Sequence, residues 1–182
     1  EKLLKSKKLS IKERLEIIKN KVIKTLGKQR QNTIVIRSLN DFSAYINKAI
    51  AAGRIAIDTE TNNSLDPITC KLMGLCLYVP GEKQAYIPIN HKDPDTEELL
   101  PNQLTEEDCR RELQRVLDAK TFVVMHNGKF DYKVIKCTCG IEIEPDWDTM
   151  IGAHTINENE KMGLKPQYIS KIDPTQEKYD ID

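Results

Sequence analysis

The chain has 182 residues, 39% of them hydrophobic and 31% charged. This composition excludes disordered and collagen-like chains and is typical of one compact domain with an appendage. No apolar run approaches the roughly 20 residues that a membrane helix needs, and no secretory signal precedes the first elements. We therefore expect a cytoplasmic protein without a membrane partner. The missing initiator methionine indicates a fragment of something longer.

The net charge of zero is the sum of a basic N-terminal segment and an acidic remainder of the chain. Residues 1–30 carry eleven Lys and Arg against three Glu, a net charge of +8, so the remainder carries −8. Ser10 and Glu13 form a capping box, and apolar residues then recur at helical spacing up to Gly27. We predict a basic N-terminal helix or linker over 1–32 and a separate domain over 33–182. Two interpretations of the helix stay open: a solvated linker, or a segment lying near nucleic acid or another acidic partner.

The domain alternates strand-like and helix-like segments. The strand-like runs cover residues 33–37, 54–58, 71–78, 84–89 and 121–125. Helical patterns follow a cap at Asn40 or Asp41 and cover 105–117, 129–136 and 148–156, whereas no firm element is predicted from Asn157 onward. Three strands in succession, followed by helix, strand and helix, predict an α/β fold with a mixed sheet flanked by helices.

The five cysteines have no obvious partners in the sequence. An odd number of cysteines without a secretion signal indicates reduced thiols. Cys137 and Cys139 are the only close pair, and a structural zinc site would need a second pair. We therefore expect buried or incidental thiols.

Two carboxylates follow an apolar run at the end of the strand predicted over 54–58. Residues i and i+2 of a strand share a face, so Asp58 and Glu60 lie side by side, away from Ile55 and Ile57. Two adjacent like charges are unfavourable unless a cation lies between them, and Mg²⁺ prefers oxygen ligands. The alternative is a solvent-facing acidic strand end.

A second polar motif, His126–Asp131 (His-Asn-Gly-Lys-Phe-Asp), follows the buried strand over 121–125. Asn127 and Gly128 suit a turn from a strand into a helix. Asp131 then falls in the first helical turn, where it can face Asp58 if the two strands are neighbours. A helix-capping or dipole role for Asp131 is the alternative.

Together these motifs resemble the 3′–5′ exonuclease domain of family A, DNA polymerase I-like DNA polymerases, a branch of the DEDD exonuclease superfamily. Ile57–Thr61 resembles the first motif of that domain, and His126–Asp131 the second. Tyr86–His91 and Trp147–Met150 resemble a following strand and a later helix start. The similarity runs from about residue 33 to 156 in the family's order. It implies a ribonuclease H-like fold.

The resemblance also implies site residues and a mechanism. It implies two Mg²⁺ or Mn²⁺ ions that hydrolyse the 3′-terminal phosphodiester, held by Asp58, Glu60 and Asp131 as three of four acidic ligands. Contacts to the single-stranded DNA 3′ end are implied for Thr61, Leu65, Asn127 and Phe130. For Leu65 and Phe130, ordinary core packing is an equal alternative.

The family's fourth acidic ligand lies in a third motif, Tyr-x-x-x-Asp, which this sequence lacks. Tyr179 and Asp182 have the right residue types at the wrong spacing. Either the chain stops before that motif, or the nuclease has degenerated, and we favour truncation.

Three functions follow from the resemblance. We expect a proofreading exonuclease domain with a polymerase domain C-terminal to it in the full-length protein. The alternatives are a catalytically silent scaffold or single-strand-binding domain, and a ribonuclease D-like RNA exonuclease.

Overall fold

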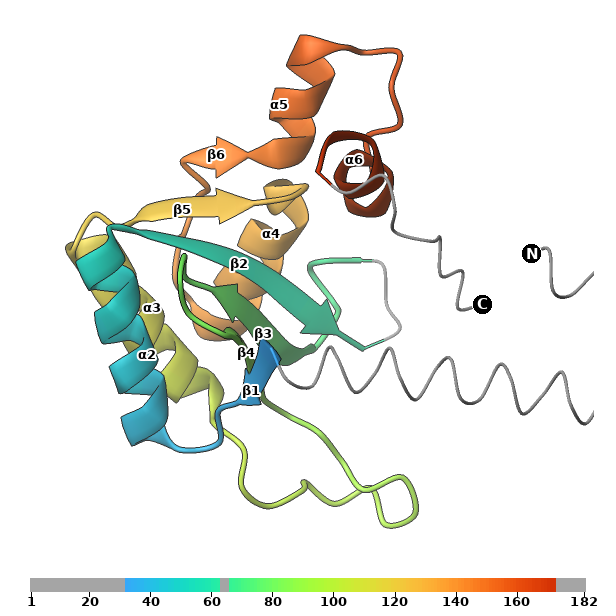
Figure 1. Ribbon diagram of the computed structural model, residues 1–182. Helices are drawn as coiled ribbons and strands as arrows, with labels where there is room; N and C mark the ends of the chain where they lie inside the picture. The colour runs from blue at the N-terminus through green and yellow to red at the C-terminus, as the bar shows by residue number, and fades with distance from the viewer. Residues whose placement is uncertain (1–31, 63–65, 173–182) are drawn as a thin grey trace, which may run out of the picture. The chain divides into compact units, whose positions relative to one another are not determined.

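The structure is a computed structural model that describes residues 32–62 and 66–172 (Figure 1). The predicted basic helix, Leu65 and the Tyr179–Asp182 pair lie outside the described residues. The chain divides into two units, Glu1–Ile34 and Val35–Asp182. The fold and the candidate site described below belong to the second unit, apart from the first residues of β1.

A six-stranded mixed sheet forms the centre of the fold, with the strand order β1-β4-β3-β2-β5-β6. The strands are β1 (Thr33–Val35), β2 (Arg54–Thr61), β3 (Leu72–Tyr78), β4 (Gln84–Pro88), β5 (Phe122–Met125) and β6 (Trp147–Asp148). β2, β3 and β4 form an antiparallel meander, whereas β5 is parallel to β2, and β6 to β5. The predicted α/β class with a mixed sheet is confirmed.

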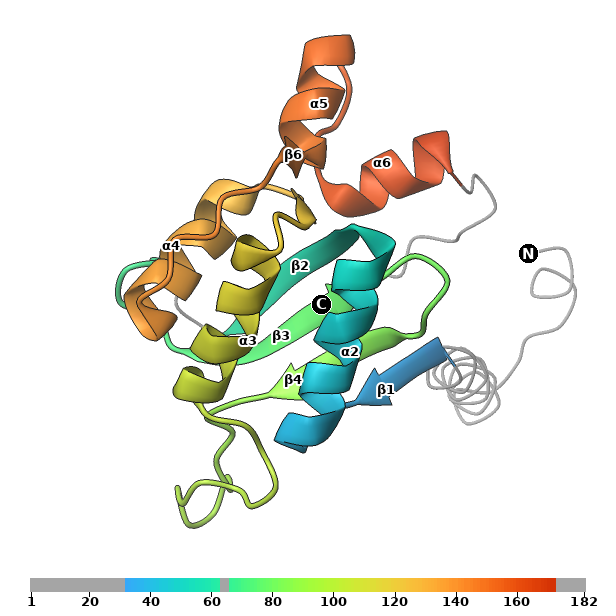
Figure 2. The ribbon, with the colours of Figure 1, turned by 90° about the vertical axis from the view of Figure 1, so that its left-hand side faces the viewer.

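The described helices are α2 (Leu39–Ala52), α3 (Glu106–Asp118), α4 (Gly128–Cys139), α5 (Thr149–Ile156) and α6 (Leu164–Lys171). α2 and α3 lie side by side over one face of the sheet (Figure 2). Alternate strand residues such as Ile57, Leu75 and Ile87 are buried beneath them with Phe42 and Leu113. Of the helices described, none is long and apolar enough to cross a membrane.

Two predicted details of the helices are wrong. α2 is capped by Ser38, not by Asn40 or Asp41, because the Ser38 hydroxyl accepts the N–H of Asp41 at 3.2 Å. Helix α6 occupies a stretch where the sequence predicts no firm element. Pro166 lies in the first turn of α6, where a helix needs no N–H donor, so this proline does not break the helix.

A buried carboxylate joins α2 to α3. Glu112 is 2% exposed. It accepts a hydrogen bond from the Ser43 hydroxyl of α2 at 2.7 Å and forms an ion pair with Arg115. Glu107, also on α3, pairs with Arg110 in an exposed position. The two carboxylates therefore differ in burial and in the bond from Ser43, which only Glu112 accepts.

We expect Glu112→Ala to lower the free energy of unfolding by about 1–2 kcal/mol, because the half-buried Ser43 hydroxyl and Arg115 guanidinium lose the carboxylate that accepts from both. Glu107→Ala, which breaks a solvent-screened pair, should cause a much smaller loss. Urea unfolding of both variants beside the wild type measures the difference. Equal losses would show that Glu112 does not join the helices as described.

Candidate active site

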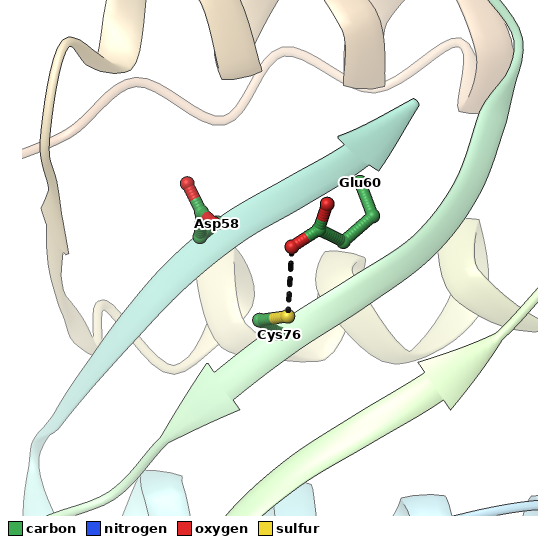
Figure 3. A group of neighbouring side chains, drawn as sticks. All are labelled: Asp58, Glu60 and Cys76. Atoms are coloured by element: carbon green, nitrogen blue, oxygen red, sulfur yellow. Dashed lines mark hydrogen bonds between the residues drawn. The ribbon is translucent and has the colours of Figure 1, made fainter. Parts of the chain in front are cut away.

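Alternation along β2 places Asp58 and Glu60 on the same face of the sheet, as the sequence predicts (Figure 3). Both residues are exposed, whereas Ile55, Ile57 and Thr59 face the buried side. The aliphatic residues hold the strand on the core, and the carboxylates consequently project from the opposite face.

A third side chain, Cys76 of β3, joins this pair. Cys76 lies directly opposite Asp58 in the antiparallel register, and its Sγ donates a hydrogen bond to Glu60 Oε1 at 3.7 Å. One ligand atom from each of Asp58, Glu60 and Cys76 lies within 4.8 Å of the others. Burial, followed by the charges of Glu60 and Asp58, raises the pKa of Cys76 to about 12, so the thiol is a protonated donor.

All five cysteines are free thiols, as expected, but the position of Cys76 was missed by sequence reasoning. The alternating pattern of residues 71–78 predicts which side chains share a face of β3. It does not determine the register between β3 and β2, and only that register places the Cys76 thiol beside the two carboxylates.

Asp131 reaches β2 from the first turn of α4. It is 3% exposed, and its Oδ1 accepts both the backbone N–H of Thr59 at 2.9 Å and the Thr59 hydroxyl at 2.6 Å. β5 pairs with β2 only along Arg54–Ala56. Beyond the end of β5, Asp131 therefore accepts the β2 backbone N–H that a neighbouring strand would otherwise bond. Asp131 does not belong to the group formed by Asp58, Glu60 and Cys76.

The carboxylates influence one another. Desolvation by the surrounding protein, followed by the charges of Asp131 and Glu60, raises the pKa of Asp58 from 3.8 to about 6. Burial likewise raises the pKa of Asp131, and the two hydrogen bonds from Thr59 partly oppose this shift. Asp58 and Asp131 are thus close enough for the charge of one to disfavour the charge of the other.

Asp148 fixes the turn that leads into α4. Its carboxylate accepts the backbone N–H groups of Asn127 at 3.1 Å and Gly128 at 2.8 Å, and also caps α5 through Met150 at 2.8 Å. Burial alone would raise the pKa of Asp148, but four backbone donors, including Ile151, lower it. Asn127 adopts the left-handed conformation at φ 59°. The prediction that Asp148 caps the following helix is confirmed.

The remaining residues predicted to contact the DNA differ in solvent exposure. Asn127 is exposed at the start of α4, and Thr61 is half-buried at the end of β2. Phe130 is half-buried and packs against the core, so one side of it faces the interior. Leu65 falls in the undescribed gap between residues 62 and 66.

A hollow of about 610 Å³ lies between α4, β6 and α5, and Tyr132, Trp147 and Ile151 are among its lining residues. None of the three predicted acidic ligands lines it. We therefore place the candidate site at Asp58 and Glu60 and not in this hollow.

The donor set at Asp58 and Glu60 suits a divalent cation. Two carboxylates on one face, with the pKa of Asp58 raised partly by its acidic neighbours, form a cluster that a cation would stabilise. Their oxygen atoms are the ligands that Mg²⁺ and Mn²⁺ prefer.

The profile of a 3′–5′ exonuclease family matches residues 33–167. The chain belongs to this DNA polymerase I-type exonuclease family. The match extends beyond residue 156, the last residue of the resemblance carried by the motifs, and it includes part of α6.

Curated relatives agree with this family. The chain is 34% identical over 110 residues to DNA polymerase I of Borreliella burgdorferi, covering 60% of this chain and 11% of that protein. It is 30% identical over 138 residues to DNA polymerase I of Rhizobium leguminosarum, covering 68% of this chain and 13% of that protein. The exonuclease-type chain thus spans only a small part of these relatives.

The fold agrees as well. Escherichia coli RNase D, an exoribonuclease, superimposes with a TM-score of 0.58 at 20% identity, covering 81% of this chain and 35% of that one. The ribonuclease H-like fold implied by the motifs is confirmed.

Asp131 supports the fold of this exonuclease domain, so we expect Asp131→Ala to lower its free energy of unfolding by about 1–2 kcal/mol. The substitution leaves the Thr59 N–H and hydroxyl without their acceptor, and relief from an unfavourable buried charge offsets part of that loss. Asp131→Asn keeps an acceptor oxygen and should lose less. Urea unfolding in EDTA measures both, with Thr59→Val separating the hydroxyl bond from the backbone bond. An unchanged stability in Asp131→Ala would contradict the bracing role.

Asp58→Asn should stabilise the metal-free protein at neutral pH by an amount on the order of 1 kcal/mol, since solvent access screens the repulsion. The folded state of the wild type binds more protons than the unfolded state between pH 3.8 and about 6. Wild-type stability therefore falls as pH rises through that window, whereas the variant escapes this fall.

Unfolding of Asp58→Asn and the wild type in EDTA across pH tests this expectation. The difference in stability should shrink as the pH falls below about 6 and vanish well below pH 3.8, where Asp58 is protonated in both states. A difference in stability between the variant and the wild type that stays constant with pH would show that the titration of Asp58 does not cause it.

Proposed function

We propose that this chain is a proofreading domain that removes nucleotides from the 3′ end of single-stranded DNA by two-metal hydrolysis. The observation that carries the proposal is the pair of neighbouring carboxylates, Asp58 and Glu60, on one face of β2. Membership of the 3′–5′ exonuclease family gives this pair its chemical interpretation.

The roles of the carboxylates follow from the motif match. Asp58 would hold both ions, Glu60 would hold one ion and orient the attacking water, and Asp131 would hold the second ion. When bound, two divalent ions activate a water molecule and stabilise the departing 3′ oxygen. The bonds from Thr59 keep the Asp131 carboxylate oriented while substrate binds.

The other predicted residues suit contacts with the strand end. Asn127 is exposed beside Asp131's helical turn, and Thr61 follows Glu60 directly. The half-buried ring of Phe130 supports a partial contact with a base, since stacking on aromatic rings tolerates any sequence. We further propose that the full-length protein carries a polymerase domain, as its relatives named DNA polymerase I suggest.

Degradation of a 5′-labelled single-stranded DNA tests the proposal. The complete 182-residue chain is incubated with Mg²⁺ and then Mn²⁺, beside Asp58→Ala, Glu60→Ala and the control Asp95→Ala. Asp95 is an exposed carboxylate in the loop between β4 and α3. We expect shortening from the 3′ end that EDTA abolishes, and at least a roughly hundredfold loss in the two site variants, because removing metal ligands removes a large part of transition-state stabilisation.

Each outcome decides something. Unchanged trimming in Asp58→Ala would overturn the site assignment, and faster trimming of RNA than of DNA would favour the ribonuclease D-like alternative. If the wild type shortens neither single-stranded DNA nor single-stranded RNA, the catalytically silent alternative is favoured for this chain. A longer chain that includes a Tyr-x-x-x-Asp motif then tests whether a fourth ligand restores the activity.

A further inference from the structure

Cys76 brings a sulfur atom into a site whose other predicted ligands are oxygen atoms. Its strand β3 pairs with β2 on one side and with β4 on the other. Cys76 lies opposite Asp58 of β2 and opposite Tyr86 of β4. The thiol is therefore held in position by the register of three strands. The Sγ atom is within 4.8 Å of ligand atoms from both Asp58 and Glu60.

The distance between the sulfur and a Glu60 oxygen fits two ligands of one metal ion. A tetrahedral ion such as Zn²⁺ binds thiolate sulfur at about 2.3 Å and carboxylate oxygen at about 2.1 Å, which places the two ligand atoms about 3.6 Å apart. Sγ and Oε1 are 3.7 Å apart in the hydrogen-bonded structure. The same arrangement can thus hold either a proton or a shared ion without movement of the strands.

We propose that Cys76 determines which ions the site retains, by adding a sulfur ligand for thiophilic divalent cations such as Zn²⁺ or Co²⁺ beside Asp58 and Glu60. This inference rests on the proposed metal site. Mg²⁺ binds oxygen and avoids sulfur, whereas Zn²⁺ and Co²⁺ accept both. Coordination replaces the thiol proton with the ion, and the proton passes to the buffer.

The sulfur ligand has a direct spectroscopic signature. Co²⁺ bound to a thiolate gives a charge-transfer absorption in the near ultraviolet that oxygen ligands do not give. The complete chain, reduced and metal-free, is titrated with Co²⁺ beside Cys76→Ser, Asp58→Asn and Cys137→Ser. Cys137 is the exposed cysteine and serves as the matched control. We expect the band in the wild type and Cys137→Ser, and its loss in Cys76→Ser and Asp58→Asn.

Calorimetry with Zn²⁺ and Mg²⁺ tests the selectivity. Cys76→Ser keeps a hydroxyl that can donate to Glu60, and far-ultraviolet circular dichroism checks that it folds. We expect its Zn²⁺ dissociation constant to rise by about tenfold or more, as for removal of a metal-site partner, with a much smaller change for Mg²⁺.

Three outcomes would overturn the proposal: no band in the wild type, an undiminished band in Cys76→Ser, or equal losses of Zn²⁺ and Mg²⁺ affinity. None of these depends on nuclease activity. Failure of the proposed function appears instead as a wild-type chain that shortens neither DNA nor RNA, so the two failures are distinguishable.

Discussion

The alternation of side chains along β2 is the constraint on which the candidate site depends. Ile55 and Ile57 are buried beneath the helices, and this burial forces Asp58 and Glu60 to the opposite face. A slip of one residue would turn both carboxylates into the core, at a cost far above any gain from pairing. The hydrophobic core thus determines where the charges lie, and the charges then determine which ligands the site can accept.

Asp131 and Asp148 extend this constraint to the helices. Asp148 holds the first N–H groups of α4, and Gly128 allows close packing, because a Cβ there would lie 2.8 Å from Met125 Cβ. With its start fixed in this way, α4 brings Asp131 to the free edge of β2. Two carboxylates that accept backbone N–H groups therefore connect α4 to the ends of β2 and β6. No cationic side chain of the described residues forms an ion pair with either carboxylate.

The sequence predicts the parts of this site that follow from local patterns. Alternation along β2 correctly predicts that Asp58 and Glu60 share a face, and the parallel pairing of β2 with β5 meets the condition set for Asp131. The contact between Cys76 and Glu60 depends on strand register across a long connection, so no local pattern predicts it. Helix α6, which begins at Leu164, is not predicted for a different reason. Its short, polar sequence has no clear apolar periodicity, and Pro166 is a residue that usually indicates a helix break.

The three predicted acidic ligands are not equivalent, and this affects how their variants are interpreted. Asp131 is buried and braces Thr59, so its replacement removes a structural acceptor together with a charge. Asp58 accepts no such bond from the described residues and remains exposed, so its replacement changes mainly the charge of the site. A loss of activity in an Asp131 variant therefore mixes two causes. The assignment of metal-dependent chemistry to this domain must rest on Asp58 and Glu60, where structure and charge can be separated.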